Sequence, residues 1–105
     1  MEFIETRVFS KCVGVFFGDD EYRRLQAMLL VYPDAGDVIP GSGGLRKLRW
    51  ASAGKGKRGG IRIIYYWYVR EEQIFLLYAY RKSAVLDLTK EQIKFLRQLI
   101  GEQGS

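Results

Sequence analysis

The sequence predicts an α+β fold in a single domain that spans residues 1–105. Two apolar and aromatic runs, at residues 61–69 and 74–80, are separated by a short polar turn, which is typical of consecutive buried strands. Two other segments, 19–33 and 89–101, place their apolar residues at helical spacing. With 105 residues, 48% hydrophobic and 28% charged, the chain suits one globular domain with a modest core.

The N-terminal part is predicted to form a strand followed by a helical hairpin. Residues 3–9 alternate loosely, as a first strand would. The segment after them could continue as a strand or form a short helix, and we favour the helix, with Ser10 as its N-cap. A clearer helix begins at Asp19, where three acidic residues suit the helix dipole, and ends before Pro33. One face of that helix carries four large side chains: Tyr22, Leu25, Leu29 and Tyr32.

A three-stranded antiparallel meander is predicted for the middle of the chain. Residues 34–44 are rich in residues that break regular structure and predict an irregular connection. Three strands follow, at residues 45–51, 60–69 and 73–80. The pleat of the first puts Leu45, Lys47 and Arg49 on one side and Arg46, Leu48 and Trp50 on the other. The predicted sheet is therefore small and antiparallel, and consists of the N-terminal strand and this meander.

The C-terminal segment predicts a helix with recognisable ends. Thr89 and Gln92 have the spacing of a capping box, and Gly101 is expected to stop the helix. Its apolar face is formed by Ile93, Leu96, Leu99 and Ile100.

Positive charge is concentrated in one third of the chain. Between Val38 and Arg70 there are eight Lys or Arg and no Asp or Glu, whereas the remainder has nine basic residues against twelve acidic ones. The eight are Arg46, Lys47, Arg49, Lys55, Lys57, Arg58, Arg62 and Arg70. Since no acid lies nearby in the sequence to pair with them, this segment favours an external polyanion.

The stretch "GKGKRGG", residues 54–60, combines these charges with glycines. Such a loop is either a solvated hairpin tip or a place where backbone closely approaches a phosphate. Its spacing differs from a Walker or dinucleotide-binding loop. The charge continues into both adjacent strands, and this favours phosphate binding.

Several classes of chemistry are disfavoured by composition. The chain has no histidine and a single cysteine, Cys12, so an internal disulfide is excluded and a zinc site is implausible. Catalysis would have to use Lys, Arg, Tyr or carboxylates, and no cofactor or metal is expected. No stretch approaches the roughly 18 apolar residues of a membrane span, so a cytoplasmic protein without membrane contact is expected.

Tyrosines beside the basic residues point towards RNA, whose unpaired bases stack on exposed aromatic rings. Tyr66 shares a strand face with Arg62, and Tyr80 ends its strand next to Arg81 and Lys82. These two are expected to reach the surface. For any single tyrosine, a place in the core is an equally good interpretation.

Three segments, "GDVIPGSGGLRKLRWA", "GKGKRGGIRIIYYW" and "FLLYAYRKSAVLDLT", resemble the HigB branch of the RelE/ParE superfamily of bacterial type II toxins. They occur in the family's order, and the resemblance spans nearly the whole chain. It implies a RelE-like fold and a metal-independent endoribonuclease, an mRNA interferase, that cuts mRNA in the ribosomal A site. It also implies a helix-turn-helix antitoxin of the HigA type as partner.

The resemblance also implies candidate catalytic residues. Lys47 and Arg49 match the basic pair on the family's second strand, Arg62 matches the arginine that enters its third, and Lys82 occupies the basic position after its last strand. Arg62 would stabilise the phosphate, Lys82 or Arg81 would protonate the leaving oxygen, and Lys47 would help the 2′-hydroxyl lose its proton.

Other basic residues would hold the RNA without taking part in the chemistry. They are Arg46, Lys55, Lys57 and Arg58. In one respect the chain departs from the family pattern, because the position of a late base-orienting tyrosine falls on Leu88. Tyr66 or Tyr80 would have to serve, or the ribosome would supply the stacking.

Two other classes remain open. A ParE-like toxin shares the fold and poisons DNA gyrase, and a plain RNA-binding module would not cleave. The charge at residues 46, 47, 49, 62 and 82 argues for the ribonuclease.

Overall fold

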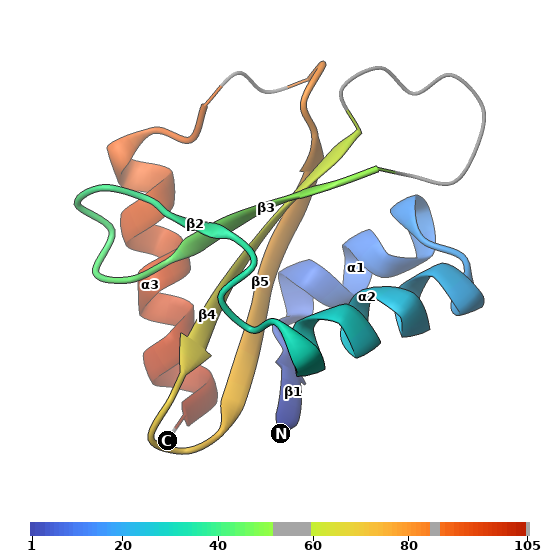
Figure 1. The fold of residues 1–105 in the computed structure, drawn as a ribbon. Helices are drawn as coiled ribbons and strands as arrows, with labels where there is room; N and C mark the ends of the chain where they lie inside the picture. The colour runs from blue at the N-terminus through green and yellow to red at the C-terminus, as the bar shows by residue number, and fades with distance from the viewer. Residues whose placement is uncertain (52–59, 85–86, 105) are drawn as a thin grey trace.

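The computed structural model describes residues 1–51, 60–84 and 87–104 (Figure 1). Lys55, Lys57 and Arg58 therefore lie outside the described residues. The elements are β1 (Glu2–Glu5), α1 (Arg7–Phe16), α2 (Asp19–Val31), β2 (Asp37–Val38), β3 (Arg46–Trp50), β4 (Ile61–Tyr68), β5 (Gln73–Arg81) and α3 (Lys90–Gly104). The predicted α+β class, helical hairpin and C-terminal helix are confirmed.

The strands form one sheet in the order β1-β5-β4-β3-β2. The predicted antiparallel meander of β3, β4 and β5 is confirmed. The prediction that the whole sheet is antiparallel is wrong, because β1 pairs in parallel with β5, from Glu2 opposite Gln73 to Glu5 opposite Leu76. No hairpin joins these two strands, so no tight turn imposes an antiparallel direction. The predicted irregular connection also contains β2, a short edge strand that pairs with β3.

The first helix begins earlier than the sequence suggested. Thr6 is its N-cap, and Thr6 Oγ1 accepts a hydrogen bond from the Phe9 amide at 3.0 Å while donating to the Leu77 carbonyl at 2.9 Å. Ser10 is therefore not the N-cap, and its hydroxyl donates instead to Glu5 Oε1. The buried Thr6 side chain thus caps α1 and also bonds to β5. Because Thr6 is the N-cap of α1, β1 ends one residue earlier, at Glu5.

The helix α2 follows its prediction more closely. Its acidic first turn is Asp19, Asp20 and Glu21, and the helix ends at Val31, before Pro33. Leu25 and Leu29 are fully buried, as expected for the apolar face. Tyr32 lies beyond the last helical turn and is 61% exposed, so its predicted place on that face is wrong.

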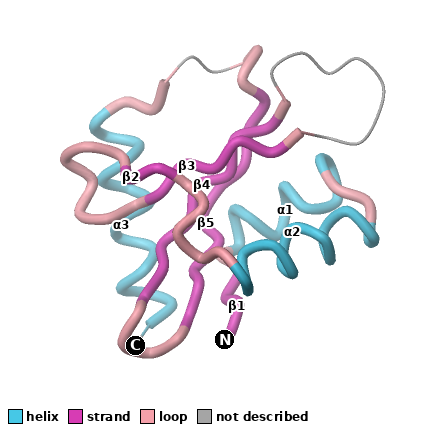
Figure 2. The backbone as a smooth tube through the Cα atoms, viewed as in Figure 1, coloured by secondary structure: helices cyan, strands magenta, loops and turns pink. Residues whose placement is uncertain are grey.

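The sheet separates two cores (Figure 2). On one face, side chains of α1 and α2, including Phe9 and Leu25, pack with Ile63 and Leu76. On the other face, Leu96 and Ile100 of α3 pack with side chains such as Ile64. Below we call these the hairpin face and the α3 face. Because neighbouring residues of a strand point to opposite faces, each strand contributes to both cores.

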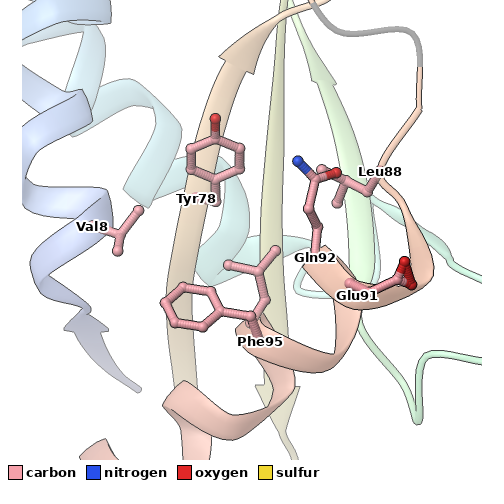
Figure 3. Close-up of a pocket in the computed structure, with 7 residues that line it drawn as sticks. Val8, Tyr78, Leu88, Glu91, Gln92 and Phe95 are labelled. Atoms are coloured by element: carbon pink, nitrogen blue, oxygen red, sulfur yellow. The ribbon is translucent and has the colours of Figure 1, made fainter.

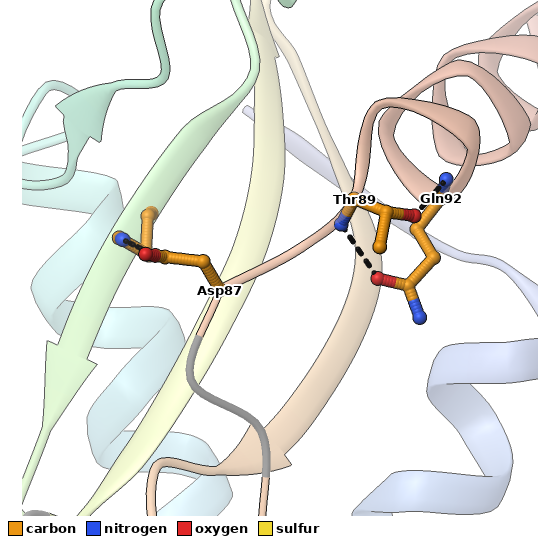
Figure 4. Close-up of polar contacts among 4 residues, drawn as sticks. Asp87, Thr89 and Gln92 are labelled. Carbon is orange, nitrogen blue, oxygen red and sulfur yellow. Dashed lines mark hydrogen bonds and ion pairs between the residues drawn. The ribbon is translucent and has the colours of Figure 1, made fainter.

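The predicted capping box of α3 is confirmed (Figure 4). The Gln92 amide donates to Thr89 Oγ1 at 3.1 Å, and the Thr89 amide donates to Gln92 Oε1 at 2.8 Å. Gly101 does not stop the helix, which continues to Gly104. Among the helices of the described residues, none has the length and apolar character needed to cross a membrane.

Candidate active site

A row of three side chains crosses the sheet on the α3 face. Arg49 on β3 lies directly opposite Arg62 on β4, and Arg62 lies opposite Tyr80 on β5. Directly opposed residues have Cβ atoms about 4.5–5.5 Å apart. Tyr80 belongs to the core beneath α3, which fixes the face. Two guanidinium groups and a phenol are thus brought together by strand pairing. We call Arg49, Arg62 and Tyr80 the basic row.

Arg62 is the buried member of the row. It is 6% exposed, whereas Arg49 on the next strand is exposed. Among the described residues, no buried side-chain nitrogen or oxygen lacks a hydrogen-bond partner. Because Arg62 is buried between residues of two neighbouring strands, its side chain has little freedom to move. A charge fixed on a regular strand is suited to stabilising negative charge that develops on a bound phosphate.

Tyr80 is buried, whereas the sequence analysis predicted that it reaches the surface. It is 3% exposed, and its ring stacks on Tyr78 with ring centroids 5.6 Å apart. Burial raises the pKa of the Tyr80 hydroxyl and the nearby Asp87 raises it further, while Arg62 lowers it. The prediction that Tyr80 reaches the surface to stack on a base is wrong, and its neutral hydroxyl remains a hydrogen-bond donor or acceptor.

Lys47 has an acidic partner that the sequence analysis did not identify. Lys47 Nζ lies 3.5 Å from Asp87 Oδ1, and Asp87 immediately precedes the segment that caps α3 (Figure 4). The two residues are forty positions apart, and only folding brings them together. One weak signal for this pair is present in the sequence, because Asp87 is an isolated acid just before a capping box. The basic segment is thus partly neutralised at one point.

A cavity of about 490 Å³ lies beside this ion pair. Lys47, Tyr80 and Asp87 line it together with apolar side chains of Ile39 and Ile93. It adjoins the basic row through Tyr80, which belongs to both. Of the three residues of the row, Tyr80 is the one that lines this cavity.

Leu88, at the position of the family's late tyrosine, lines this cavity and also a second one of about 300 Å³ between α1 and α3 (Figure 3). The second cavity is mainly apolar, with Val8, Tyr78 and Phe95 facing it. Leu88 thus forms part of the wall between two hollows, and it offers no ring for stacking.

Two predicted RNA-binding residues lie away from the row. Arg46 is on the hairpin face, where its Nη1 donates to the Gly36 carbonyl at 2.7 Å and secures the connection before β2. Tyr66 is half-buried, and the Arg97 guanidinium of α3 lies 5.0 Å from its ring centroid. Both side chains therefore have structural contacts.

The consecutive residues Arg81 and Lys82 lie on opposite sides of the sheet at the end of β5. Arg81 pairs with Ile61 of the hairpin-face core, and its guanidinium lies 5.8 Å from the ring centroid of Phe16 in α1. The Lys82 amide donates to the Gly60 carbonyl at 3.3 Å, which continues the pairing by one residue. Alternation then assigns the exposed Lys82 to the side of the basic row and Arg81 to the opposite side.

Gly60 has a structural reason to be glycine. Its φ is +64°, and an added Cβ would lie 2.6 Å from the Trp50 carbonyl oxygen. The close approach here is to β3, not to a phosphate. The other glycines of the stretch, at 54, 56 and 59, lie outside the described residues.

The fold agrees with a comparison against known protein families. A family model described as the RelE toxin of the RelE/RelB toxin–antitoxin system matches residues 36–103. The match covers more than half of the chain and includes β2 to β5 and nearly all of α3. The chain belongs to this family of toxins. It is the toxin of a toxin–antitoxin pair, and an antitoxin is its partner.

In the described part of the chain, no group of three or more His, Cys, Asp or Glu side chains is placed to hold a metal ion. The charged groups described at the site are the basic side chains together with Asp37 and Asp87, which both line the cavity beside Lys47.

Replacement of Asp87 by asparagine is expected to strengthen RNA binding about three-fold at low salt. Removing an exposed carboxylate 3.5 Å from Lys47 removes a repulsive charge and frees the ammonium, and such exposed pairs have small effects. Affinity for ribosomes measured at low and high salt checks this, with Glu71→Gln in the β4–β5 turn as a control of equal charge change. Weaker binding by the Asp87 variant would contradict the prediction.

Proposed function

We propose that this toxin is a ribosome-dependent endoribonuclease of the HigB-like branch, which enters the A site, cuts mRNA and inhibits translation in the cytoplasm. The observation that carries the proposal is the basic row, with Lys47 and Lys82 beside it on the same side of the sheet. Four cationic groups around one face, one of them paired with Asp87, favour binding of the anionic phosphates of RNA. We further propose that the antitoxin is a helix-turn-helix protein of the HigA type.

The proposed reaction is attack of an RNA 2′-oxygen on the adjacent phosphorus. The 2′-hydroxyl loses its proton, a bond forms between the 2′-oxygen and phosphorus, and the bond to the 5′-oxygen breaks. The products are a 2′,3′-cyclic phosphate and a new 5′-hydroxyl, which takes up a proton. This chemistry needs a group that stabilises the phosphorane and groups that manage two protons, and it needs neither oxidant nor cofactor.

The residues support an assignment of these roles. Arg62, buried and fixed, would stabilise the phosphorane together with Arg49. Lys82 would protonate the leaving oxygen, since its alternative Arg81 faces α1. Lys47 would lie near the 2′-hydroxyl, in the cavity that Tyr80 also lines, and help it lose its proton. Because Tyr80 is buried and Tyr66 lies against Arg97, we assign stacking of the base to the ribosome.

Cleavage is expected to need the ribosome. With a radius of gyration of 13.0 Å the chain is small, and within residues 1–51, 60–84 and 87–104 the row offers charges on an open sheet face and no enclosed cleft for a whole RNA strand. Purified protein should leave naked mRNA largely intact and cut the same mRNA on translating ribosomes. Primer extension on both samples tests this.

Equal cleavage in both settings would contradict the ribosome requirement. DNA breaks without mRNA cuts would instead identify a gyrase poison, and ribosome binding without cuts would identify a binding module.

A further inference from the structure

Arg81 lies at a cavity that is separate from the proposed active site. This cavity, of about 430 Å³, lies where the end of β5 meets α1. Lys11, Val15 and Phe16 of α1 line one side, and Arg81 and Ala84 line the other. Figure 1 shows α1 alongside β5, on the side of the sheet opposite α3. The two cavities share Tyr80 as part of their walls.

The charge of this cavity is positive. Lys11 and Arg81 both lie on its lining, and none of the described residues that line it is acidic. Both side chains are exposed, and the Arg81 guanidinium lies over the Phe16 ring, 5.8 Å from its centroid. This ring holds the guanidinium by a cation–π contact, which uses no N–H donor. Its donors therefore remain available to an anion.

The remaining lining favours a nucleotide over a simple anion. Val15 is 67% exposed, and Phe16 and Ala84 add apolar surface next to the two cations. A nucleotide presents a phosphate to basic groups and a flat apolar base to such a surface, and arginine can contact both. The Cys12 sulfur, also in the lining, lies within hydrogen-bond distance of the Val8 and Ala79 carbonyls, and its single S–H is engaged in the fold.

We infer that Lys11 and Arg81 form a second RNA-binding site, which holds a nucleotide of ribosomal RNA while the basic row acts on mRNA. The inference rests on the proposed function, since RNA is the polyanion expected beside the A site. Arg81 and Lys82 are consecutive residues on opposite sides of β5, so one strand end contacts two RNA chains. Arg81 then contributes to binding, and Lys82 to the chemistry.

The test is the affinity of the full chain for mRNA-programmed ribosomes at several salt concentrations, together with the single-turnover cleavage rate at saturation. Lys11→Ala and Arg81→Ala should each weaken binding about ten-fold and lower the slope of log affinity against log salt by roughly 0.7. The saturated cleavage rate should not change. Arg81→Lys should recover the slope and only part of the affinity, because it keeps the charge and loses the planar group.

Arg24→Ala serves as the matched control, because Arg24 is an exposed arginine of α2 outside this cavity, and it should bind normally. Unchanged affinity in both variants, or a lower saturated rate, would overturn the inference. Binding of a glutamate-rich peptide should also be measured. If both variants bind this peptide more weakly and bind ribosomes normally, the ligand is an acidic protein segment and the inference is overturned. If the wild type binds ribosomes without cutting mRNA, the proposed function fails, and the affinities still decide this inference.

Discussion

Arg62→Ala is expected to slow cleavage on programmed ribosomes by about 100- to 1,000-fold at saturation, while ribosome binding changes little. Arg62 is 6% exposed on a regular strand, between Arg49 and Tyr80. A donor fixed in this way stabilises charge that develops in the transition state without having to reorganise. The exposed cations around it supply most of the binding, so the loss should be in the rate and not in the affinity.

Single-turnover cleavage at increasing ribosome concentration separates the two quantities. Arg70→Ala is the matched control, an exposed arginine just beyond β4. Because Arg62 is buried, the unfolding midpoint of each variant should be measured alongside, and Arg62→Lys should keep the fold and lose most of the rate. An Arg62→Ala protein that keeps its saturated rate and loses only affinity would remove this arginine from the chemistry.

Gly60→Ala is expected to lower the free energy of unfolding by about 2–4 kcal/mol. Gly60 has a φ of +64°, and its Cβ would lie 2.6 Å from the Trp50 carbonyl oxygen, which belongs to the backbone and cannot turn aside. Relief of that contact would move β4 away from β3. Arg62, which pairs with Arg49, is only two residues from Gly60 and would be displaced as well. We therefore expect cleavage to fall together with stability.

Urea unfolding measures the first effect, and cleavage at a temperature where the variant is folded measures the second. Gly14→Ala in α1 is the control, since its Cβ would meet nothing within 4 Å, and this change should stabilise the protein by about 0.4–1 kcal/mol. Equal stability of the Gly60 variant and the wild type would show that the strand pair adapts to the side chain.

Much of the fold was predictable because its signals are local. The buried strands β4 and β5 carry long apolar runs, and Thr89 and Gln92 are close enough in sequence to be recognised as a cap. The basic positions on β3 followed from alternation along a single strand. Each of these predictions needed only neighbours within a few residues.

The features that the sequence analysis missed depend on contacts between distant residues. Thr6 caps α1 and also contacts Leu77, so its position between strand and helix is set by β5. Asp87 meets Lys47 only when α3 lies over the sheet. Tyr80 lies near the end of β5 and is nevertheless buried, because α3 covers its face. Local patterns predict which residues of a strand point to the same face. They do not predict which helix covers that face.

The parallel pairing of β1 with β5 bears on how the chain folds during its own synthesis. Glu2 pairs with Gln73, and Thr6 needs the Leu77 carbonyl, so the first six residues have no complete partner until β5 has left the ribosomal exit tunnel. Contacts this far apart in sequence slow folding, because a long loop must close before they form. Arg62 also receives its Tyr80 neighbour only from β5. The basic row therefore assembles only after β5 has been translated and has left the exit tunnel, so a nascent chain that ends before β5 carries no finished row.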